Sequence, residues 1–416
     1  MPRGSRSIQT AVSARAAGRS CTRSSRTWWR ARASPRTRSS AGPLDQNFGK
    51  SAPFSLGVEE EFQLLHAESY ELVSRIDEIL RAFEGEEAEH RVKAELLQSV
   101  VEVATGVAAT VEEAIADLRD LRGRLRDAAA ERDAVIASAG THPFSRYEHQ
   151  EVTDEPRYLD LIESMRWIAE RELIFGLHVH VGLDSPEKAI ACANGLRTYL
   201  PELLALSANS PFWQGRQTGL ASTRVKVFEP FPRAGLPPAF ASYEEFELMV
   251  ERGIKTNSFE DYTYIWWDLR PHPRLGTIEL RICDAQTRID SVAAIAALTQ
   301  TLVATMAADF DRGEPPATEP ITLIAENKWR AARDGLDAKL IDFANDTERP
   351  AREALRRLVE LSRPAAEELG CAPQLDLVEG LLERGTGADE QLAVYEQSES
   401  LLAVAEQLAA ETVRGV

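Results

Sequence analysis

The chain has 416 residues, a formal net charge of −18 and an isoelectric point near 5.0, a length that suits roughly two to three domains or one large α+β domain. A net charge this negative excludes a general nucleic-acid-binding surface. It does not exclude an anionic substrate, because a bound metal ion can make the electrostatic potential of a site positive. Four cysteines without a Cys-x-x-Cys pair indicate a reducing, cytoplasmic location, and the apolar runs predict no membrane span because they are too short and too charged.

The first 44 residues differ in composition from the rest of the chain. They contain ten arginines and no Asp or Glu, and Ser, Thr, Ala and Pro make up most of the remainder. Such a segment cannot bury a core, so residues 1–50 are predicted to be a disordered basic tail or an upstream stretch included by a wrongly chosen start codon. Residues 51–416 are predicted to form one domain with a helical C-terminal part, and without the ten arginines the remainder carries −28.

Gly49-Lys50-Ser51 ends like a phosphate-binding P-loop. That motif needs a further glycine five residues before Gly49, and position 44 is leucine. The three residues are therefore interpreted as linker.

The stretch 55–65 is predicted to be a strand with acidic side chains on one face. Side chains alternate with a period of two, so Glu59, Glu61 and Gln63 share a face opposite Val58, Glu60 and the apolar residues that follow. Neighbouring carboxylates repel each other unless a cation lies between them. Taken alone, the pattern favours a solvated edge strand.

Two later stretches alternate in the same way and change this interpretation. His178 and His180 share one face of a predicted strand at 175–183, and Glu279 and Arg281 share one face of another at 276–284. If the three strands pack on one core, their polar faces line one surface. Carboxylates with a few imidazoles suit Mg²⁺ or Mn²⁺, so a metal site is preferred over three unrelated polar faces.

Two further polar residues leave alternatives open. Glu102 lies in an apolar run that ends in a strand, and is either a metal ligand or a paired core carboxylate. His142, in the loop 140–144, either lines a site or is a solvated polar group, and the second interpretation is preferred. The loop 208–224 is rich in Gly, Arg and hydroxyl groups, as ligand-gripping loops and flexible loops both are.

The remaining pattern is mostly helical. A capping box at Thr110 begins one predicted helix, and Ser185-Pro186 begins another. The predicted helices cover residues 70–83, 110–132, 156–173, 185–207, 243–255, 291–310, 326–335, 348–369, 374–384 and 388–413, and further strands are predicted at 135–139 and 262–270.

Several motifs, in order, match a known family. The sequence resembles the carboxylate–amine ligases of the glutamate–cysteine ligase type 2 group over about residues 54–410. The matching segments are Gly57–Phe62, His178–Gly182, Ser207–Trp213, Thr218–Gly219, Trp267–Pro273, Gly276–Arg281 and Glu326–Arg330.

The resemblance implies an α+β fold like that of glutamine synthetase, in which a curved antiparallel sheet forms a funnel backed by helices. It also implies ATP and Mg²⁺ as cofactors, small amino-acid substrates and a homodimer. By position, the implied metal-site residues are Glu59, Glu61, Glu95, Glu102, His178 and Glu279, where Glu95 binds either metal or a substrate amine. Arg281 matches a phosphate-facing arginine, Arg224 and Arg216 fit substrate carboxylate or phosphate, and His180 is either a ligand or a support for His178.

The implied activity joins a carboxylate to an amine at the expense of ATP. Glutamate and cysteine are the pair that give the family its name. Phosphoryl transfer requires positioning and charge neutralisation more than a protein nucleophile, which agrees with the acids and arginines present. The alternatives are a metal-dependent hydrolase with the same ligand set and a catalytically silent binding protein on the same fold.

Overall fold

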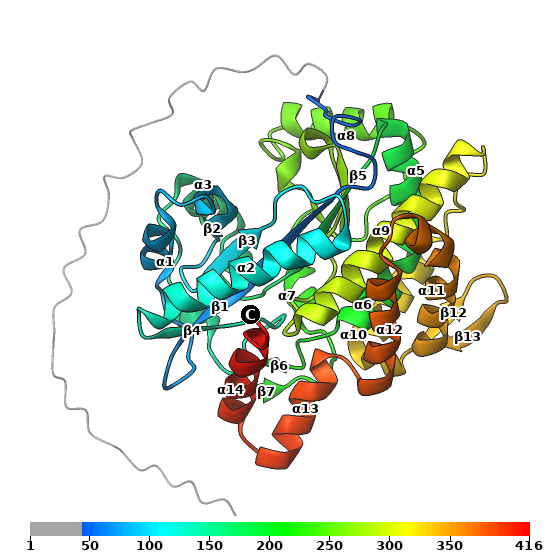
Figure 1. Cartoon of the computed structure of the whole chain (residues 1–416). Helices are drawn as coiled ribbons and strands as arrows, with labels where there is room; N and C mark the ends of the chain where they lie inside the picture. The colour runs from blue at the N-terminus through cyan, green and yellow to red at the C-terminus, as the bar shows by residue number, and fades with distance from the viewer. Residues whose placement is uncertain (1–43) are drawn as a thin grey trace, which may run out of the picture. The chain divides into compact units, whose positions relative to one another are not determined.

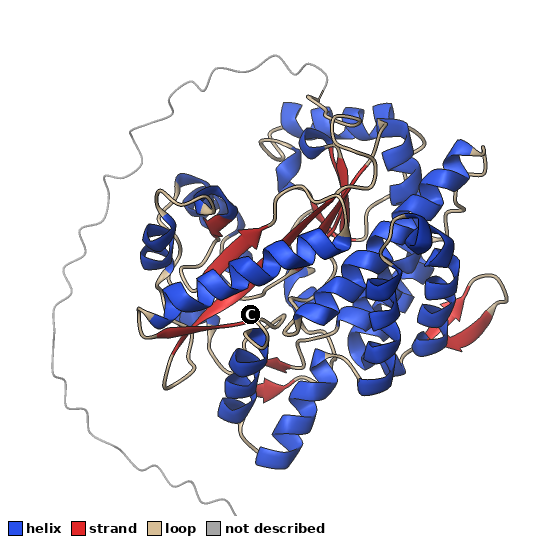
Figure 2. Cartoon of the chain, in the orientation of Figure 1, coloured by secondary structure: helices blue, strands red, loops and turns tan. Residues whose placement is uncertain are grey.

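A seven-stranded antiparallel sheet lies at the centre of residues 44–416, the part of the chain that the computed structural model describes (Figures 1 and 2). Its strands follow the order β10-β11-β5-β1-β3-β2, and β4 also pairs with β1. The strands of this sheet are β1 Leu56–His66, β2 Val92–Ala94, β3 Val100–Ala104, β4 Ala134–Ala137, β5 Leu177–Gly182, β10 Leu269–His272 and β11 Thr277–Leu280.

Helices surround this sheet, and three two-stranded sheets lie outside it. The small sheets pair β6 Phe212–Trp213 with β7 Arg216–Gln217, β8 Ala234–Gly235 with β9 Trp266–Trp267, and β12 Lys339–Asp342 with β13 Thr347–Pro350. The helices are α1 Ile76–Phe83, α2 Val111–Ala130, α3 Pro156–Met165, α4 Trp167–Glu170, α5 Pro186–Leu196, α6 Leu200–Ser207, α7 Arg224–Phe228, α8 Tyr243–Lys255, α9 Ile289–Asp311, α10 Ile321–Asp334, α11 Ala351–Glu368, α12 Ala372–Arg384, α13 Gly387–Ser398 and α14 Leu401–Thr412.

The strand register brings the predicted polar faces together, as alternation requires. Glu59 of β1 is paired with His178 of β5, and Glu61 is paired with Glu102 of β3. On the far side of β5, His180 is paired with Glu279 of β11. The prediction that three distant strands share one polar surface is therefore confirmed.

The opposite face of the sheet is apolar and covered by helices. Val58, Phe62, Val179 and Ile278 are fully buried in one hydrophobic cluster with residues of α2 and α9, which lie against this face (Figure 1). Helix α9 is long and apolar enough to cross a membrane by length and composition, contrary to the sequence-based expectation. Because 89% of its apolar window is buried inside the protein, α9 serves here as a core helix.

One charged pair interrupts this apolar face. Glu60 points into the core, as its place in the alternation predicts, and there it meets Arg122 of α2. Both side chains are fully buried and joined by two hydrogen bonds of 2.5 and 2.9 Å. Arg122 also donates to the backbone carbonyls of Gln286, Thr287 and Thr412, so it ties the central strand to the segment after β11 and to α14.

Several predicted helices are shorter or interrupted. The predicted helix 156–173 breaks at Arg166 and the predicted helix 388–413 breaks at Glu399, where φ is +54° and +51°. A residue in this left-handed region cannot continue a right-handed helix. A 3₁₀ turn at Arg197–Tyr199 divides α5 from α6, and the helix predicted from residue 70 begins only at Ile76.

Residues 44–50, predicted to belong to the tail, are packed on the domain. The Asn47 backbone donates to the Pro273 carbonyl at 2.9 Å, and the Gly49 backbone donates to the Leu183 carbonyl at 2.8 Å. Phe48 packs against two hydrophobic clusters. Residues 44–50 therefore belong to the folded unit, and the prediction for residues 1–43 lies outside the described residues.

Candidate active site

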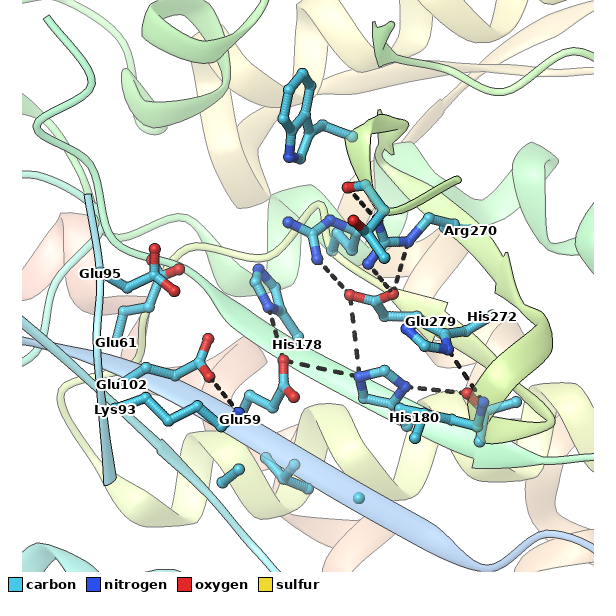
Figure 3. Close-up of a pocket in the computed structure, with 18 of the residues that line it drawn as sticks. Glu59, Glu61, Lys93, Glu95, Glu102, His178, His180, Arg270, His272 and Glu279 are labelled. Carbon is cyan, nitrogen blue, oxygen red and sulfur yellow. Dashed lines mark hydrogen bonds and ion pairs between the residues drawn. The ribbon is translucent and has the colours of Figure 1, made fainter. Parts of the chain in front are cut away.

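A pocket of about 760 Å³ opens on the polar face of the central sheet. Its wall includes the polar residues of β1, β3, β5 and β11, and these side chains point toward one another (Figure 3). Further wall residues come from β10, from α3 and α7, and from the segment that precedes β1. The pocket thus gathers the carboxylates, imidazoles and guanidiniums that the sequence places far apart.

Two candidate metal groups share Glu59. Glu59, Glu102 and His178 form one group, and Glu59, His180 and Glu279 form the other, with the ligand atoms of each group within 4.8 Å of one another. The distance from Glu59 Oε2 is 3.3 Å to His178 Nδ1 and 3.8 Å to His180 Nε2. The Nε2 atoms of both histidines are buried without a hydrogen-bond partner among the described residues, as expected of atoms reserved for a ligand.

A third candidate group consists of carboxylates alone. Glu61, Glu95 and Glu102 bring one oxygen each within 4.8 Å of the others. Glu61 is held by a 2.5 Å hydrogen bond from the Gly176 backbone, and Glu102 by a 2.8 Å ion pair with Lys93. A site built only from carboxylate oxygens suits a hard cation such as Mg²⁺ or Mn²⁺.

The protonation equilibria of these carboxylates also favour a cation. Burial raises the pKa of Glu95 well above its ordinary value, and Glu102 and Glu61 add to the rise. Burial and the charge of Glu59 raise the pKa of Glu102 to about 7, against the opposing effect of Lys93. Crowded, desolvated carboxylates of this kind are stabilised in their ionised form when a divalent cation neutralises them.

The histidines differ in their preferred charge. Burial lowers the pKa of His178, and the positive charge of Arg281 lowers it further, so this ring is neutral and suited to bind a metal. Burial also opposes the charged form of His180, but Glu279 and Glu59 outweigh it and raise the pKa. His180 Nδ1 lies 3.0 Å from Thr277 Oγ1, which fixes the ring.

One end of the pocket is rich in arginine. Glu279 is buried and forms ion pairs with Arg270, at 2.7 Å, and with Arg281. Although burial would raise the pKa of Glu279, the two guanidiniums hold it well below its usual range. The Nε of Arg281 has no hydrogen-bond partner among the described residues, so this end has a donor available for an anionic ligand.

The structure brings together all but one of the predicted site residues. Glu59, Glu61, Glu95, Glu102, His178, His180, Arg224, Glu279 and Arg281 all line the pocket. Arg216 is not among the residues that line this pocket; it lies exposed on β7.

Two expectations about single segments differ from the structure. His142, expected to be a solvated polar group, is buried, and its Nε2 lies 2.9 Å from the Tyr70 carbonyl. Burial lowers the pKa of His142 to about 4, so its role is structural. The presumed linker 49–51 contributes Lys50 and Ser51 to the pocket wall.

Sequence reasoning missed Arg270, Lys93 and Glu172 as pocket residues. Arg270 lies directly opposite Glu279 in the β10–β11 register, and Lys93 lies opposite Glu102 in β2–β3. Strands of four and three residues are too short for alternation to predict this pairing. Glu172 lies six residues before His178, in a segment that was predicted to be helical.

An antiparallel sheet that is backed by helices and carries a polar pocket on its other face places the chain in the fold class of the glutamine-synthetase-like ligases. Two solved structures share the fold with TM-scores of 0.64. One is a glutamate–cysteine ligase from Francisella tularensis, which is 13% identical and matches over 87% of this chain and 90% of that chain. The other is a bifunctional glutathione synthetase from Pasteurella multocida, which is 15% identical; the match covers 86% of this chain and only about half, 52%, of that one. The predicted fold class is thus confirmed.

The chain belongs to glutamate–cysteine ligase family 2 (GCS2), whose pattern it matches over residues 55–408. A Rubrobacter xylanophilus protein named "Putative glutamate--cysteine ligase 2-1" is 48% identical over 362 residues, 87% of this chain and 95% of that protein. A protein of Herpetosiphon aurantiacus with the name "Putative glutamate--cysteine ligase 2" is 43% identical over 88% of this chain and 94% of its own length. The chain is therefore a ligase that forms C–N bonds, and the hydrolase alternative finds no support.

Proposed function

We propose that the protein is an ATP-dependent carboxylate–amine ligase that works with Mg²⁺, or Mn²⁺, through an acyl phosphate. The observation that carries the proposal is the meeting of two carboxylate–imidazole groups and one all-carboxylate group with Arg270 and Arg281 in one pocket. Family membership supports it. The carboxylate substrate attacks the γ-phosphorus of ATP, ADP leaves, and the amine then displaces phosphate from the acyl phosphate.

The described residues have distinct roles in this proposal. Glu59, Glu102, His178, His180 and Glu279, with Glu61 and Glu95, hold the divalent cations, which when bound neutralise phosphate charge. Arg281 faces the transferred phosphoryl group, and its planar guanidinium can bind two phosphate oxygens at once. Arg270 keeps Glu279 ionised and oriented. Arg224 fits a carboxylate of the substrate.

The proposed substrates are small amino compounds. The names of the relatives support glutamate and cysteine as the pair that is joined. In our proposal the γ-carboxyl group of glutamate is activated and cysteine supplies the amine. Other amines fit the same chemistry, because the acyl phosphate reacts with any unprotonated amine placed beside it. A cytoplasmic location and a homodimer complete the proposal.

Oxygen transfer tests the mechanism directly. Glutamate labelled with ¹⁸O in its γ-carboxyl group should deliver one ¹⁸O atom to the released phosphate, with ADP as the nucleotide product. Phosphate from simple ATP hydrolysis carries no such label, and Glu59→Gln protein serves as the inactive control. Release of AMP and pyrophosphate would overturn the acyl phosphate mechanism in favour of an adenylate.

A further inference from the structure

Glu172 is a pocket residue that belongs to none of the three candidate metal groups. It lies in the short segment between α4 and β5. Its Oε2 atom is shielded from solvent and has no hydrogen-bond partner among the described residues. A buried carboxylate oxygen that accepts no hydrogen bond destabilises the folded protein. A ligand with N–H groups would remove this penalty by donating to the oxygen.

The surroundings of Glu172 are fixed by contacts with α7 and β1. Arg171 donates to the Val227 carbonyl at 3.3 Å, which attaches this segment to α7. Gly176 allows Arg224 of α7 to approach closely, because a Cβ at this position would lie 2.4 Å from Arg224 Nη2. The Gly176 backbone in turn holds Glu61. The charged groups that act on Glu172 are the guanidiniums of Arg224 and Arg171 and the carboxylate of Glu61.

These neighbours do not satisfy the charge of Glu172. Arg224 directs its guanidinium to the backbone carbonyls of Arg281 and Ile282 at 3.2 to 3.3 Å. Burial raises the pKa of Glu172 to about 8; Arg224 and Arg171 oppose this rise and Glu61 adds to it. Glu172 thus forms neither a hydrogen bond through Oε2 nor an ion pair within the described part of the chain.

The distribution of charge in the pocket indicates which cation fits. Arg270 and Arg281 flank Glu279, whereas Glu61 and Glu95 belong to the all-carboxylate group, and Glu61 acts on Glu172. Mg²⁺ prefers several oxygen ligands in octahedral geometry, and Glu172 does not join a group of three. An ammonium group, by contrast, can bind to one carboxylate through charge-assisted hydrogen bonds.

We propose that Glu172 binds the ammonium group of the amine substrate and thereby selects amines that arrive as cations. This inference rests on the proposed function and deepens it. The class of substrate is a primary alkylammonium, including the α-ammonium of an amino acid. The carboxylate of Glu172 holds this group in the pocket and accepts one proton from it, so that the free amine can attack the acyl phosphate.

Hydroxylamine provides the test, because it is uncharged at neutral pH and attacks acyl phosphates to give hydroxamates. With glutamate, ATP and Mg²⁺, we expect Glu172→Gln to form hydroxamate with kcat and KM within about twofold of the unsubstituted protein. Cysteine and ethylammonium should compete with hydroxylamine in the unsubstituted protein. Their inhibition constants should rise at least about tenfold in Glu172→Gln, as expected for loss of a charged hydrogen bond.

Glu170→Gln is the matched control, since Glu170 lies two residues away and is exposed outside the pocket. It should change neither reaction, and Mg²⁺ should raise the melting temperature of both variants equally. An equal loss with hydroxylamine and with the cationic amines would overturn the inference, and so would undiminished competition in Glu172→Gln. Failure of the unsubstituted protein to form either hydroxamate or ADP is a different result, which overturns the proposed function itself.

Discussion

Glu59 and Glu279 are equivalent in the sequence pattern but not in the structure. Glu279 is 1% exposed and lies between two guanidiniums, whereas the Glu59 side chain is 22% exposed and contacts histidines. A buried ion pair that loses one partner leaves an uncompensated charge, which costs more than the loss of a partly exposed contact. The two glutamates should therefore contribute differently to stability, even if both bind metal.

We expect Glu59→Gln and Glu279→Gln both to abolish turnover and to weaken Mg²⁺ binding. Only Glu279→Gln should also reduce the free energy of unfolding substantially, by about 3 kcal/mol or more, because Arg270 is left buried beside a neutral amide. Urea unfolding without metal measures the stability, and calorimetric titration measures Mg²⁺ affinity. Near-normal turnover in either variant would remove that residue from the metal site.

Glu202 of α6 gives a pH-dependent prediction outside the pocket. Burial raises its pKa to about 7, and its Oε2 has no hydrogen-bond partner among the described residues. The unfolded chain has the ordinary glutamate pKa of about 4.3, so the folded protein holds this proton more tightly. The stabilising contribution of the protonated group is complete below pH 4 and is lost as the pH rises through 7.

Glu202→Gln removes this dependence. We expect the substitution to raise the free energy of unfolding by about 2 kcal/mol more at pH 8 than at pH 5. Urea titrations of both proteins at the two pH values provide the comparison. An equal effect at both pH values would show that the carboxyl group does not titrate in this window.

At the scale of elements, alternation predicted the site better than it predicted the core. β1, β5 and β11 alternate strictly, so the sequence indicated which side chains face the pocket, and the register confirmed their meeting. The same alternation predicted that Glu60 faces the core, but it did not predict which residue neutralises its charge there. Arg122 lies 62 residues later on α2, and a periodic pattern within one strand contains no information about a contact that distant.

The interruptions of the helices could not be predicted from the sequence either. Glu399 separates α13 from α14 by adopting a left-handed conformation, although glutamate favours helix. Tertiary packing decides this break: α14 contacts β4, and Gln391 of α13 donates to Asn209 at 2.8 Å. Such contacts override local propensity and leave no local sequence signal.

The pair Glu60–Arg122 should behave as one unit. Arg122→Met leaves Glu60 buried without a partner and should reduce the free energy of unfolding by about 3 to 5 kcal/mol. Adding Glu60→Gln removes the stranded charge, so the double variant should be more stable than Arg122→Met alone. Urea unfolding of the two single variants and the double variant closes the thermodynamic cycle. Simple additivity of the two substitutions would show that the pair does not interact energetically.

At the scale of the whole molecule, the composition of the sequence predicted that the folded unit begins at residue 51, a few residues later than in the structure. The described residues from 44 onward belong to one unit that continues to the C-terminus. Gly276 shows the fit: its φ is +68°, and a Cβ there would lie 2.5 Å from the Asn47 carbonyl oxygen. A short segment bound mainly through backbone hydrogen bonds has no periodic pattern, so the sequence did not predict it.

Truncation at two neighbouring positions tests this boundary. A chain that begins at residue 44 should match the full chain in melting temperature and turnover. A chain that begins at residue 51 loses the hydrogen bonds of Asn47 and Gly49 and the packing of Phe48, and it also loses Asn47 and Lys50 from the pocket wall. We expect its melting temperature to fall by at least about 3 °C, from a loss on the order of 2 kcal/mol.

Phe48→Ala in the chain that begins at residue 44 separates packing from backbone contacts. It should reproduce part of the loss in melting temperature while keeping Asn47 and Lys50 at the pocket, so turnover should fall less than in the chain that begins at residue 51. Differential scanning calorimetry and ADP release measure the two effects independently. Identical melting curves for the chains that begin at 44 and 51 would return residues 44–50 to the tail, and a lower melting temperature with unchanged turnover would limit them to a structural role.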